Sequence, residues 1–429
     1  MTGPEKERPY WASGLEPVEN DAVAAGEAFD AVVVGAGYGG LSAALELSRQ
    51  GKKVLVVDAR NIGDGASSRA AGSLANVPKA RLHELARSYG GQVADAVYRE
   101  AVLARAHTEQ LVAGHAIDCD LRRCTRVMAA HSEKSMQRLR SEFPAMRARL
   151  PEARLLSAQE LGEFIGSSAY RGGMLVPDSA TINPAAYQFG LARVARAHGV
   201  RIAQRTRMVG LKPVAGAVAV DLAPQGAVSA AHVVLATNAE TTPDSALSAE
   251  LARSIAAVPA FCVVTQTLPP ERIAQVIRGA QIFGDTRKVL NYMALSPCGT
   301  RLVYSARAGF LEGSTADKAQ RIAAAFEARF PATRGVAVDF FWSGRFAITA
   351  DLIPHVGASD RVHWMIGCCG TGITMSTYLG HKIARRILGA EDAETVFQLP
   401  LPPMPAWQRR PALLGAAIRL HRIYDRYMK

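Results

Sequence analysis

Two adjacent cysteines, Cys368 and Cys369, lie among three glycines in the segment GCCGTGIT, which runs from Gly367 to Thr374. Thiols so close together could form a redox disulfide or bind a metal ion. Adjacent cysteines close a strained ring, however, and they lack the C-x-x-C spacing of redox sites. No second pair of cysteines or histidines stands at zinc-ligand spacing, so the sequence predicts no metal site. We therefore interpret the segment as a glycine loop whose backbone lies against a flat ligand, with the thiols as small apolar neighbours.

A second glycine-rich turn points to a definite ligand. Residues 29–60 read FDAVVVGAGYGGLSAALELSRQGKKVLVVDAR, a strand followed by G-x-G-x-x-G at Gly35, Gly37 and Gly40, then a helix, a second strand and Asp58. Such a turn brings backbone N–H groups and the positive end of a helix to a pyrophosphate, and the acid accepts hydrogen bonds from ribose hydroxyls. Asp58 follows Gly37 by 21 residues, which is typical of an adenine-dinucleotide site. A purely structural strand-turn-helix unit is the alternative.

Further segments have the same build of strand, small-residue turn and helix. Residues 61–76, NIGDGASSRAAGSLAN, are too rich in Gly, Ala and Ser to form a core, and we expect a loop that lies against a flat ring system. A flexible surface loop is the alternative interpretation. An apolar strand at 233–236 precedes the small polar turn at 237–239, and another strand at 362–366 precedes the glycine loop.

The composition is that of an ordinary globular enzyme. The chain has 429 residues, of which 50 are basic and 38 acidic, and its net charge of +12 favours anionic ligands in general. The basic residues are scattered, and we expect no nucleic-acid partner. Six cysteines without dense spacing, a polar N-terminus and no apolar run long enough to span a bilayer predict a cytoplasmic protein. Residues 411–429 predict a basic amphipathic helix that docks on the protein itself; peripheral contact with a membrane surface is the alternative.

Taken in order, these motifs resemble those of FAD-dependent oxidoreductases of the D-amino acid oxidase and glycine/sarcosine oxidase family. The resemblance extends over nearly the whole chain, and the branch it resembles most contains gamma-glutamylputrescine oxidoreductase. It rests on Tyr10 and Trp11, the glycine turn, GASSRAAG at 65–72, LATNA at 235–239, WSG at 342–344 and the C-terminal GCCGTG.

The resemblance implies an α/β fold with two domains, each built from discontinuous segments. A Rossmann-type FAD-binding domain would comprise residues 28–90, 152–245 and 336–392. An α+β substrate-binding domain with an antiparallel sheet would comprise residues 91–151 and 246–335, and residues 393–429 would form a C-terminal amphipathic helix and tail.

The cofactor that the resemblance implies is non-covalent FAD. Some relatives attach the flavin through a cysteine near the segment that corresponds to residues 344–351, and this segment contains none here. The residues expected to contact FAD are Gly35, Ala36, Gly37, Tyr38, Gly39, Gly40, Asp58, Ala59, Arg60, Ala66, Ser67, Ser68, Ala71, Gly72, Met208, Thr237, Gly344, Gly370, Thr371, Gly372, Ile373 and Thr374.

The implied activity is oxidation of an amine or amino acid at a C–N bond. The substrate would pass a hydride to flavin N5, the resulting imine would be hydrolysed, and O2 would reoxidise the flavin to give H2O2. N–H groups at a helix N-terminus would stabilise the negative charge that appears during the reaction. No general base is required if the amine enters neutral, and we nominate none.

Aromatic and basic residues are the candidates on the substrate side. Tyr292, Tyr304 and Trp342 could form the walls of an amine pocket, with ordinary core aromatics as the alternative. Arg301 is the candidate for the basic residue that activates oxygen in relatives. Lys288 and Arg307 are the alternatives for that role, and His355 could border the flavin or fill a turn.

Two other functions remain open at this point. A dehydrogenase with the same fold would pass electrons to a quinone or a carrier protein, and a dinucleotide-binding module would have no catalytic role. The sequence departs from the family pattern at Ala70, Thr125 and Met293, so it does not identify the amine. It also leaves the oligomeric state open.

Overall fold

Two eight-stranded sheets form the frame of the chain in the computed structural model, which describes residues 8–289, 291–306 and 313–427. The first sheet contains β1 (Ala28–Val34), β2 (Val54–Val57), β6 (Arg201–Ala203), β7 (Arg207–Val214), β8 (Ala217–Ala223), β9 (Gly226–Leu235), β15 (His355–Ser359) and β16 (Val362–Ile366). The second contains β3 (Arg122–Ala129), β4 (Arg154–Ser157), β5 (Gly172–Thr181), β10 (Ala256–Thr265), β11 (Ile282–Asp285), β12 (Asn291–Leu295), β13 (Leu302–Ala306) and β14 (Val338–Ile348).

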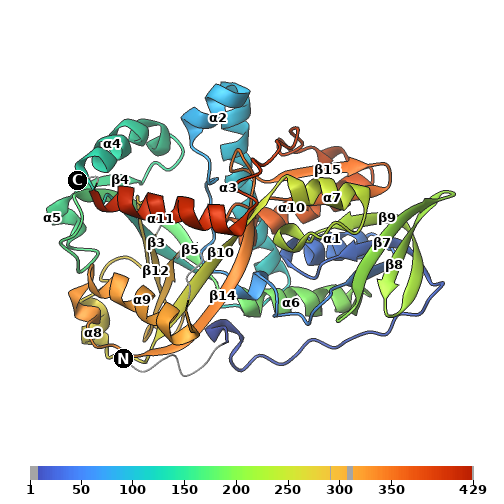
Figure 1. The fold of residues 1–429 in the computed structure, drawn as a ribbon, viewed down its shortest axis with the longest axis horizontal. Coiled ribbons are helices and arrows are strands. Elements are labelled where there is room, and N and C mark those ends of the chain that lie inside the picture. The colour runs from blue at the N-terminus through green and yellow to red at the C-terminus, as the bar shows by residue number, and fades with distance from the viewer. Residues whose placement is uncertain (1–7, 290, 307–312, 428–429) are drawn as a thin grey trace.

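Helices surround both sheets, which lie side by side in Figure 1 with the first sheet on the right and the second on the left. The helices are α1 (Tyr38–Arg49), α2 (Leu82–Tyr89), α3 (Gly91–Gly114), α4 (Glu133–Arg147), α5 (Ala158–Leu161), α6 (Pro184–Ala197), α7 (Ala246–Arg253), α8 (Pro270–Ala274), α9 (Thr315–Glu327), α10 (Gly372–Ile387) and α11 (Pro411–Tyr427). The expected α/β fold with a second, mainly antiparallel sheet is confirmed.

The first sheet is a mixed sheet whose strands β16, β9, β1, β2 and β6 are parallel, with β1 at the centre, while β15, β7 and β8 are joined to it by antiparallel pairs. Its strand order is β15-β16-β9-β1-β2-β6, and β1 pairs in parallel with both β2 and β9. Residues 31–34 of β1 are buried, as a central parallel strand requires, because helices cover both faces of such a sheet. The predicted strands at 54–57 and 362–366 have these bounds in the structure, and the strand at 233–236 is the end of the longer β9.

The second sheet has two faces with different neighbours. Its order is β14-β10-β13-β12-β11-β3-β5-β4, and of these neighbouring pairs only β3 and β11 are parallel. We call one face the loop face; its buried residues include Cys124, Ile282, Tyr292, Ala294, Cys262 and Trp342. We call the other the helix face; its residues, such as Phe261, Phe283, Tyr304 and Phe341, pack with Phe326 of α9. Side chains alternate between the faces along each strand.

Sheet membership differs from the predicted domain ranges at three strands. β4, β5 and β14 belong to the second sheet, although their residues fall within the ranges expected for the FAD-binding domain. The first sheet does draw its strands from widely separated parts of the chain, as expected for a discontinuous domain. The domain boundaries themselves stay a prediction.

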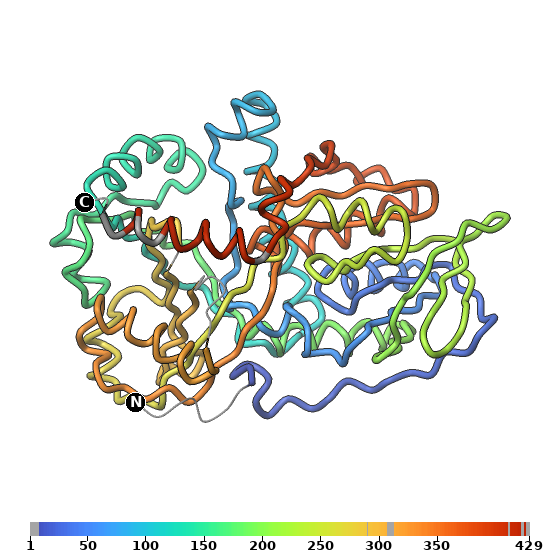
Figure 2. The backbone as a smooth tube through the Cα atoms, in the orientation of Figure 1, coloured from blue at the N-terminus to red at the C-terminus, as the bar shows by residue number. Residues whose placement is uncertain are grey.

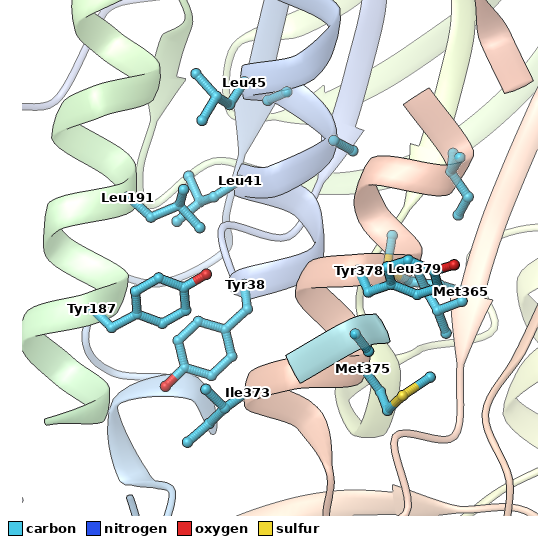
Figure 3. Close-up of a cluster of buried hydrophobic side chains, with 14 of the residues drawn as sticks. Tyr38, Leu41, Leu45, Tyr187, Leu191, Met365, Ile373, Met375, Tyr378 and Leu379 are labelled. Carbon is cyan, nitrogen blue, oxygen red and sulfur yellow. The ribbon is translucent and has the colours of Figure 1, made fainter. Parts of the chain in front are cut away.

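A buried cluster between α1, α6 and α10 holds these three helices together (Figure 3). Tyr38 at the start of α1 stacks on Tyr187 of α6, with 5.2 Å between the ring centroids, and Ile373 of α10 lies beside it. The Tyr38 hydroxyl donates to the carbonyls of Ser67 (2.5 Å) and Pro184 (3.0 Å). Because burial raises its pKa well above the ordinary value, this hydroxyl stays protonated and remains a donor.

The two ends of the described chain lie along the outside of the sheets. Figure 2 shows the N-terminal segment following the edge of the first-sheet half before it enters β1, and Gln204 donates to the carbonyl of Val18 in this segment at 2.8 Å. The predicted C-terminal helix is present as α11. Its Asp425 is buried and accepts from the backbone N–H groups of Lys288 and Val289 at 3.2 and 3.1 Å, so the helix docks on the second sheet's own loops. Among the described residues, no helix is both long and apolar enough to cross a bilayer.

A histidine pair joins β9 and β16. His363 is buried, its Nε2 lies 3.3 Å from His232 Nδ1, and its own Nδ1 has no partner among the described residues. Burial, together with the neighbouring His232 and Arg386, lowers the pKa of His363 to about 4. The folded protein therefore resists protonation of this ring.

We expect this pair to destabilise the fold in acid. A His pKa that is lower in the folded than in the unfolded chain gives stability that is present above about pH 6.5 and is lost as the pH falls towards 4. His363→Gln should abolish up to roughly 3 kcal/mol of this loss, measured as melting temperature against pH. Equal acid sensitivity of the variant and the wild type would contradict this expectation. His107, whose pKa is also lowered to about 4, keeps part of the effect in both proteins.

Candidate active site

The turn between β1 and α1 is built on glycines that no other residue can replace. Gly35 has φ +108°, and a Cβ there would lie 2.8 Å from the carbonyl oxygen of Ala236 at the end of β9. A Cβ at Gly40 would lie only 1.9 Å from the oxygen of Gly35. The helix therefore packs directly on the turn, and its first N–H groups point at the space beyond the strand ends.

Asp58 completes this turn from the neighbouring strand. Its Oδ2 accepts from the N–H of Ala36, and its Oδ1 accepts from the N–H of Arg60, both at 2.9 Å. Burial raises the pKa of Asp58, while these two donors and the Arg60 charge oppose the rise. Each carboxylate oxygen accepts one backbone bond and retains capacity for another donor, such as a ribose hydroxyl.

A cavity of about 340 Å³ lies beside this turn at the ends of β1, β2 and β9. Half of the residues expected to contact FAD line it. They are Gly35, Gly37, Tyr38, Gly39, Asp58, Ala59, Arg60, Ala66, Ser67, Met208 and Thr237. The Ser67 hydroxyl accepts from the Tyr38 N–H at 3.3 Å, and a Cβ at Gly37 would lie 3.1 Å from it, so the loop at 65–67 closes against the turn.

The other expected FAD contacts are not part of the cavity lining. Ala36 and Gly40 support the turn, whereas the side chain of Ile373 points into the helix core of Figure 3. The remaining residues are Ser68, Ala71, Gly72, Gly344, Gly370, Thr371, Gly372 and Thr374. Thr374 donates to the carbonyl of Ala75 at 3.0 Å, which ties the start of α10 to the segment that follows the 65–72 loop.

The lining includes residues that the sequence did not single out, and two of them, Gln188 and Asn238, bond the loops around the cavity. Gln188 of α6 donates from Nε2 to the carbonyl of Ala36 at 2.8 Å, and its buried Oε1 has no partner among the described residues. Asn238 adopts φ +47° after β9, and its Oδ1 accepts from the N–H of Gly367 at 3.0 Å. A polar residue in the otherwise apolar stretch PAAYQFG was the signal for Gln188, and the turn TNA was the signal for Asn238.

The glycine loop with the two cysteines lies next to this cavity. Cys368 lines it, and its Sγ accepts from Asn238 Nδ2 at 3.2 Å. Cys369 has φ +50°, and its Sγ lies 3.4 Å from the Thr349 hydroxyl. Burial raises the pKa of both thiols, that of Cys369 to about 12. Both are free thiols, and no cluster of metal-binding side chains occurs in the part of the chain that the structure describes.

The 65–75 segment connects the cavity with the second sheet. The carbonyl of Arg69 accepts from Trp342 Nε1 at 3.0 Å, and Ala71 packs against the loop-face cluster that contains Tyr292. The expected contact at Gly344 also lies here, because a Cβ on it would lie 3.2 Å from the Arg69 Cβ. The structure therefore brings Trp342 and Tyr292 to the same side of the sheet, next to this segment.

The other two predicted substrate-side residues have different neighbours. Tyr304 is on the helix face, where its ring stacks on Phe326 with 3.8 Å between centroids, so it cannot share a pocket wall with Tyr292 and Trp342. The reason is the two-residue period of the strand, which points Tyr304 away from the loop face. Arg301, which directly precedes β13, pairs with Asp339 at 2.6 Å and lies over the ring of Phe340, in the cluster that contains Trp342; like Trp342, it does not line the cavity.

Of the two alternatives to Arg301, one has a partner elsewhere and the other lies outside the described residues. Lys288 lies over the Tyr424 ring of α11, with 4.4 Å from Nζ to the centroid. Arg307 lies outside the described residues. His355 is fully buried, and its Nε2 contacts Asp351 at 3.0 Å, so it belongs to a structural pair beneath the glycine loop.

Comparison with known proteins decides the family. The model of the family described as DAO, FAD dependent oxidoreductase, matches residues 30–386. The chain belongs to this family. FAD is therefore its cofactor, and the turn, the free acceptor capacity of Asp58 and the unpaired Oε1 of Gln188 fit an adenine-dinucleotide group. The family also makes the chain an oxidoreductase of the amine and amino-acid oxidase group.

Individual relatives agree with this assignment. A probable oxidoreductase OrdL of Haemophilus influenzae is 27% identical over 373 residues, which is 86% of this chain and 85% of that protein. Gamma-glutamylputrescine oxidoreductase of Escherichia coli is 27% identical over 379 residues, 88% of each chain. Glycine oxidase from Geobacillus kaustophilus shares the fold, with a TM-score of 0.74 and 20% identity, covering 89% of this chain and all of that one.

We expect Asp58→Ala to weaken FAD binding by about tenfold to a hundredfold, because it removes a charged acceptor from the turn. The measurement is flavin released on denaturation per mole of protein, with the dissociation constant from titration of the apoprotein. Asp64→Ala is the matched control, since the exposed carboxylate of Asp64 accepts only from Asn61 among the described residues and Asp64 lies outside the cavity lining. Equal FAD content in both variants would contradict the role of Asp58.

We expect Cys298 to be the most reactive thiol of the native protein. Although burial opposes ionisation, hydrogen bonds from Ser296 and Thr300 lower its pKa to about 7, and it is exposed. Iodoacetamide near neutral pH should modify Cys298 first and leave Cys368 and Cys369 intact until the protein unfolds. Peptide mass spectrometry at successive reaction times gives the order in which the cysteines are modified.

Variants of the glycine loop test the interpretation of the cysteine pair. Cys368→Ala and Cys369→Ala should each retain FAD, because both thiols are neutral and serve as packing groups, whereas Gly370→Val should lose it, since Gly370 has φ +86°. Early alkylation of the pair in the native protein, or zinc in the purified protein, would show the interpretation wrong.

Proposed function

We propose that this enzyme oxidises the C–N bond of an amine or amino acid by transfer of a hydride to FAD, with dioxygen as the electron acceptor. The oxidised product is an imine, which water hydrolyses to a carbonyl compound and a smaller amine or ammonia. Two electrons and two protons leave the substrate and reduce O2 to H2O2. Bound FAD supplies the hydride acceptor that no amino-acid side chain can provide.

One observation supports this function above the others. The 65–75 segment lies between the cofactor cavity and the loop face of the second sheet, with Ser67 against the glycine turn and Arg69 bonded to Trp342. A cofactor that extends from the cavity along this segment would have its far end beside Trp342 and Tyr292. These two aromatic residues come from strands of the second sheet and could enclose an amine against the reacting end of the cofactor.

The start of α10 supplies the electrostatic part of the proposed site. Gly372 begins the helix, and the glycine loop before it places the first backbone N–H groups beside the segment at 71–75, where Thr374 bonds to Ala75. Free N–H groups at a helix N-terminus favour negative charge that develops during the reaction. The nearby thiols of Cys368 and Cys369 are neutral and do not oppose it.

A neutral amine would need no base from the protein. Two acids near the loops of the site are already engaged: Asp351 contacts His355, and Asp58 bonds the glycine turn. We therefore assign the chain a role in binding, orienting and excluding water, rather than in proton removal. Arg301 stays a candidate for oxygen activation, although its pairing with Asp339 favours a structural role.

We also expect a cytoplasmic enzyme with non-covalent FAD. Residues 344–351 contain no cysteine that could bind the flavin. A membrane-surface location through α11 stays the alternative, because Leu420 and Tyr424 on its outer side are exposed.

The purified protein should be yellow and should lose its flavin on denaturation. Anaerobic addition of amines, N-methyl amino acids and D-amino acids should bleach the bound flavin with at least one compound, and air should restore the colour with one H2O2 per turnover. If the flavin bleaches rapidly but air yields no peroxide, and an artificial dye or a quinone restores the colour, the enzyme is a dehydrogenase rather than an oxidase. A colourless protein that binds no added FAD would overturn the proposal entirely.

A further inference from the structure

Exposed large apolar side chains gather near the C-terminal end of the described chain. Eight such side chains are exposed among the described residues, and four of them lie between residues 407 and 424. They are Trp407, Leu413, Leu420 and Tyr424, with exposed fractions of 46, 44, 66 and 42%. Single exposed apolar side chains are normal on a protein surface, whereas a group of them in one short segment indicates a surface that contacts something apolar.

The helix α11 docks on the rest of the chain through only one of its faces. Leu414 and Asp425 are buried, and because they differ by 11 positions, about three helical turns, they lie on the same face. Leu413, Leu420 and Tyr424 follow the spacing i, i+7 and i+11, so they form a second stripe along the helix, which we call the α11 stripe. Figure 1 shows α11 running across the outside of the half that holds the second sheet. The α11 stripe therefore stays exposed while the helix is docked.

Positive charge accompanies the α11 stripe. Residues 401–429 contain six lysine and arginine residues and a single acid, Asp425. This acid is buried and accepts from two backbone N–H groups of the loop between β11 and β12, so it does not offset the basic charge at the surface. Arg409, Arg410 and Arg419 are exposed. The outer side of this segment thus combines apolar side chains with positive charge.

This combination fits the surface of an anionic bilayer. A helix at such a surface buries its apolar stripe roughly 5–10 Å deep, at the boundary between headgroups and acyl chains, and its basic side chains contact anionic headgroups. Tryptophan and tyrosine favour the same boundary, because each has an apolar ring and a polar group. The net charge of +12 for the whole chain acts in the same direction.

Other partners would use only part of this surface. In a symmetric dimer the same segment of both copies would meet, so two basic segments would repel each other. A nucleic acid would bind the positive charge but leave the α11 stripe in water. An anionic lipid surface is the partner that matches both properties.

We propose that Trp407 and the exposed side of α11 bind the enzyme reversibly to an anionic membrane surface. The helix would lie on the bilayer, since no described helix is both long and apolar enough to cross it. The inference goes beyond the proposed oxidation of an amine and does not depend on it. It gives a cytoplasmic enzyme a second location and leaves the docking of α11 through Asp425 unchanged.

Sedimentation of the FAD-loaded full-length protein with lipid vesicles tests the inference. One set of vesicles is pure phosphatidylcholine, and the other is an equimolar mixture of phosphatidylcholine and phosphatidylglycerol. The protein should pellet with the anionic vesicles and stay in the supernatant with the neutral ones. Added NaCl should release it, because salt screens the attraction between arginines and headgroups. The measured quantity is the fraction of protein that pellets at each lipid concentration.

Variants at exposed positions separate the apolar from the electrostatic contribution. Leu420→Glu should weaken binding to the anionic vesicles at least about tenfold, because it removes buried apolar area and adds a repelled charge. The double change Arg409→Gln and Arg410→Gln should weaken it about tenfold and reduce its dependence on NaCl. Leu103→Glu is the matched control: Leu103 is an equally large exposed side chain, at 54%, but lies on α3. This control should bind like the wild type, and all variants should keep the wild-type melting temperature and FAD content.

Three results would overturn the inference. The first is no binding of the wild type to the anionic vesicles, and the second is equal binding of the wild type and Leu420→Glu. The third is a wild-type dimer in sedimentation velocity that Leu420→Glu converts to a monomer, because it would make a second copy the partner. The vesicles contain no amine, so failure of this test leaves the proposed oxidation intact. Failure of every amine to bleach the flavin would likewise leave the membrane result unchanged.

Discussion

The contact between Gly40 and Gly35 sets the arrangement of everything around the cofactor cavity. Because a Cβ at Gly40 would lie 1.9 Å from the Gly35 oxygen, α1 approaches the end of β1 more closely than any other residue pair would permit. This approach places Tyr38, the first residue of α1, in the core with α6 and α10. The same glycine contact therefore aligns a helix end for phosphate binding and fixes the helices that surround it.

The segment at 65–75 joins the glycine turn to the second sheet and to the start of α10 by hydrogen bonds. Its Ser67 bonds the start of α1, its Arg69 carbonyl bonds Trp342, and its Ala75 carbonyl bonds Thr374. Small residues are required here, since the segment must fit between a helix turn, a sheet face and the start of α10. A loop fixed at three points can present its backbone to a ligand without the entropy cost of ordering it at the moment of binding.

Local patterns predicted the parts of the site that depend on local geometry. Strand bounds at 54–57 and 362–366, the turn at Gly35 and the position of Asp58 follow from residues within one strand-turn-helix unit. The faces of the second sheet could not be predicted in this way. Tyr292 and Tyr304 are both aromatic strand residues, but a register set by pairing with β11 and β10 sends one to the loop face and the other to α9.

Charge pairing on β3 shows the same limit in another form. The string RRCTRV contains three arginines that sequence alone cannot distinguish. Asp120, which pairs with Arg122, stands just before the string, whereas Glu109 and Asp178, which pair with Arg123, come from more distant parts of the chain. Only the fold reveals that Arg126 lies opposite Ile282 of the loop face and that it has no ion pair among the described residues. A protein that retains such a group forgoes some stability, and functional sites are where this trade is normally found.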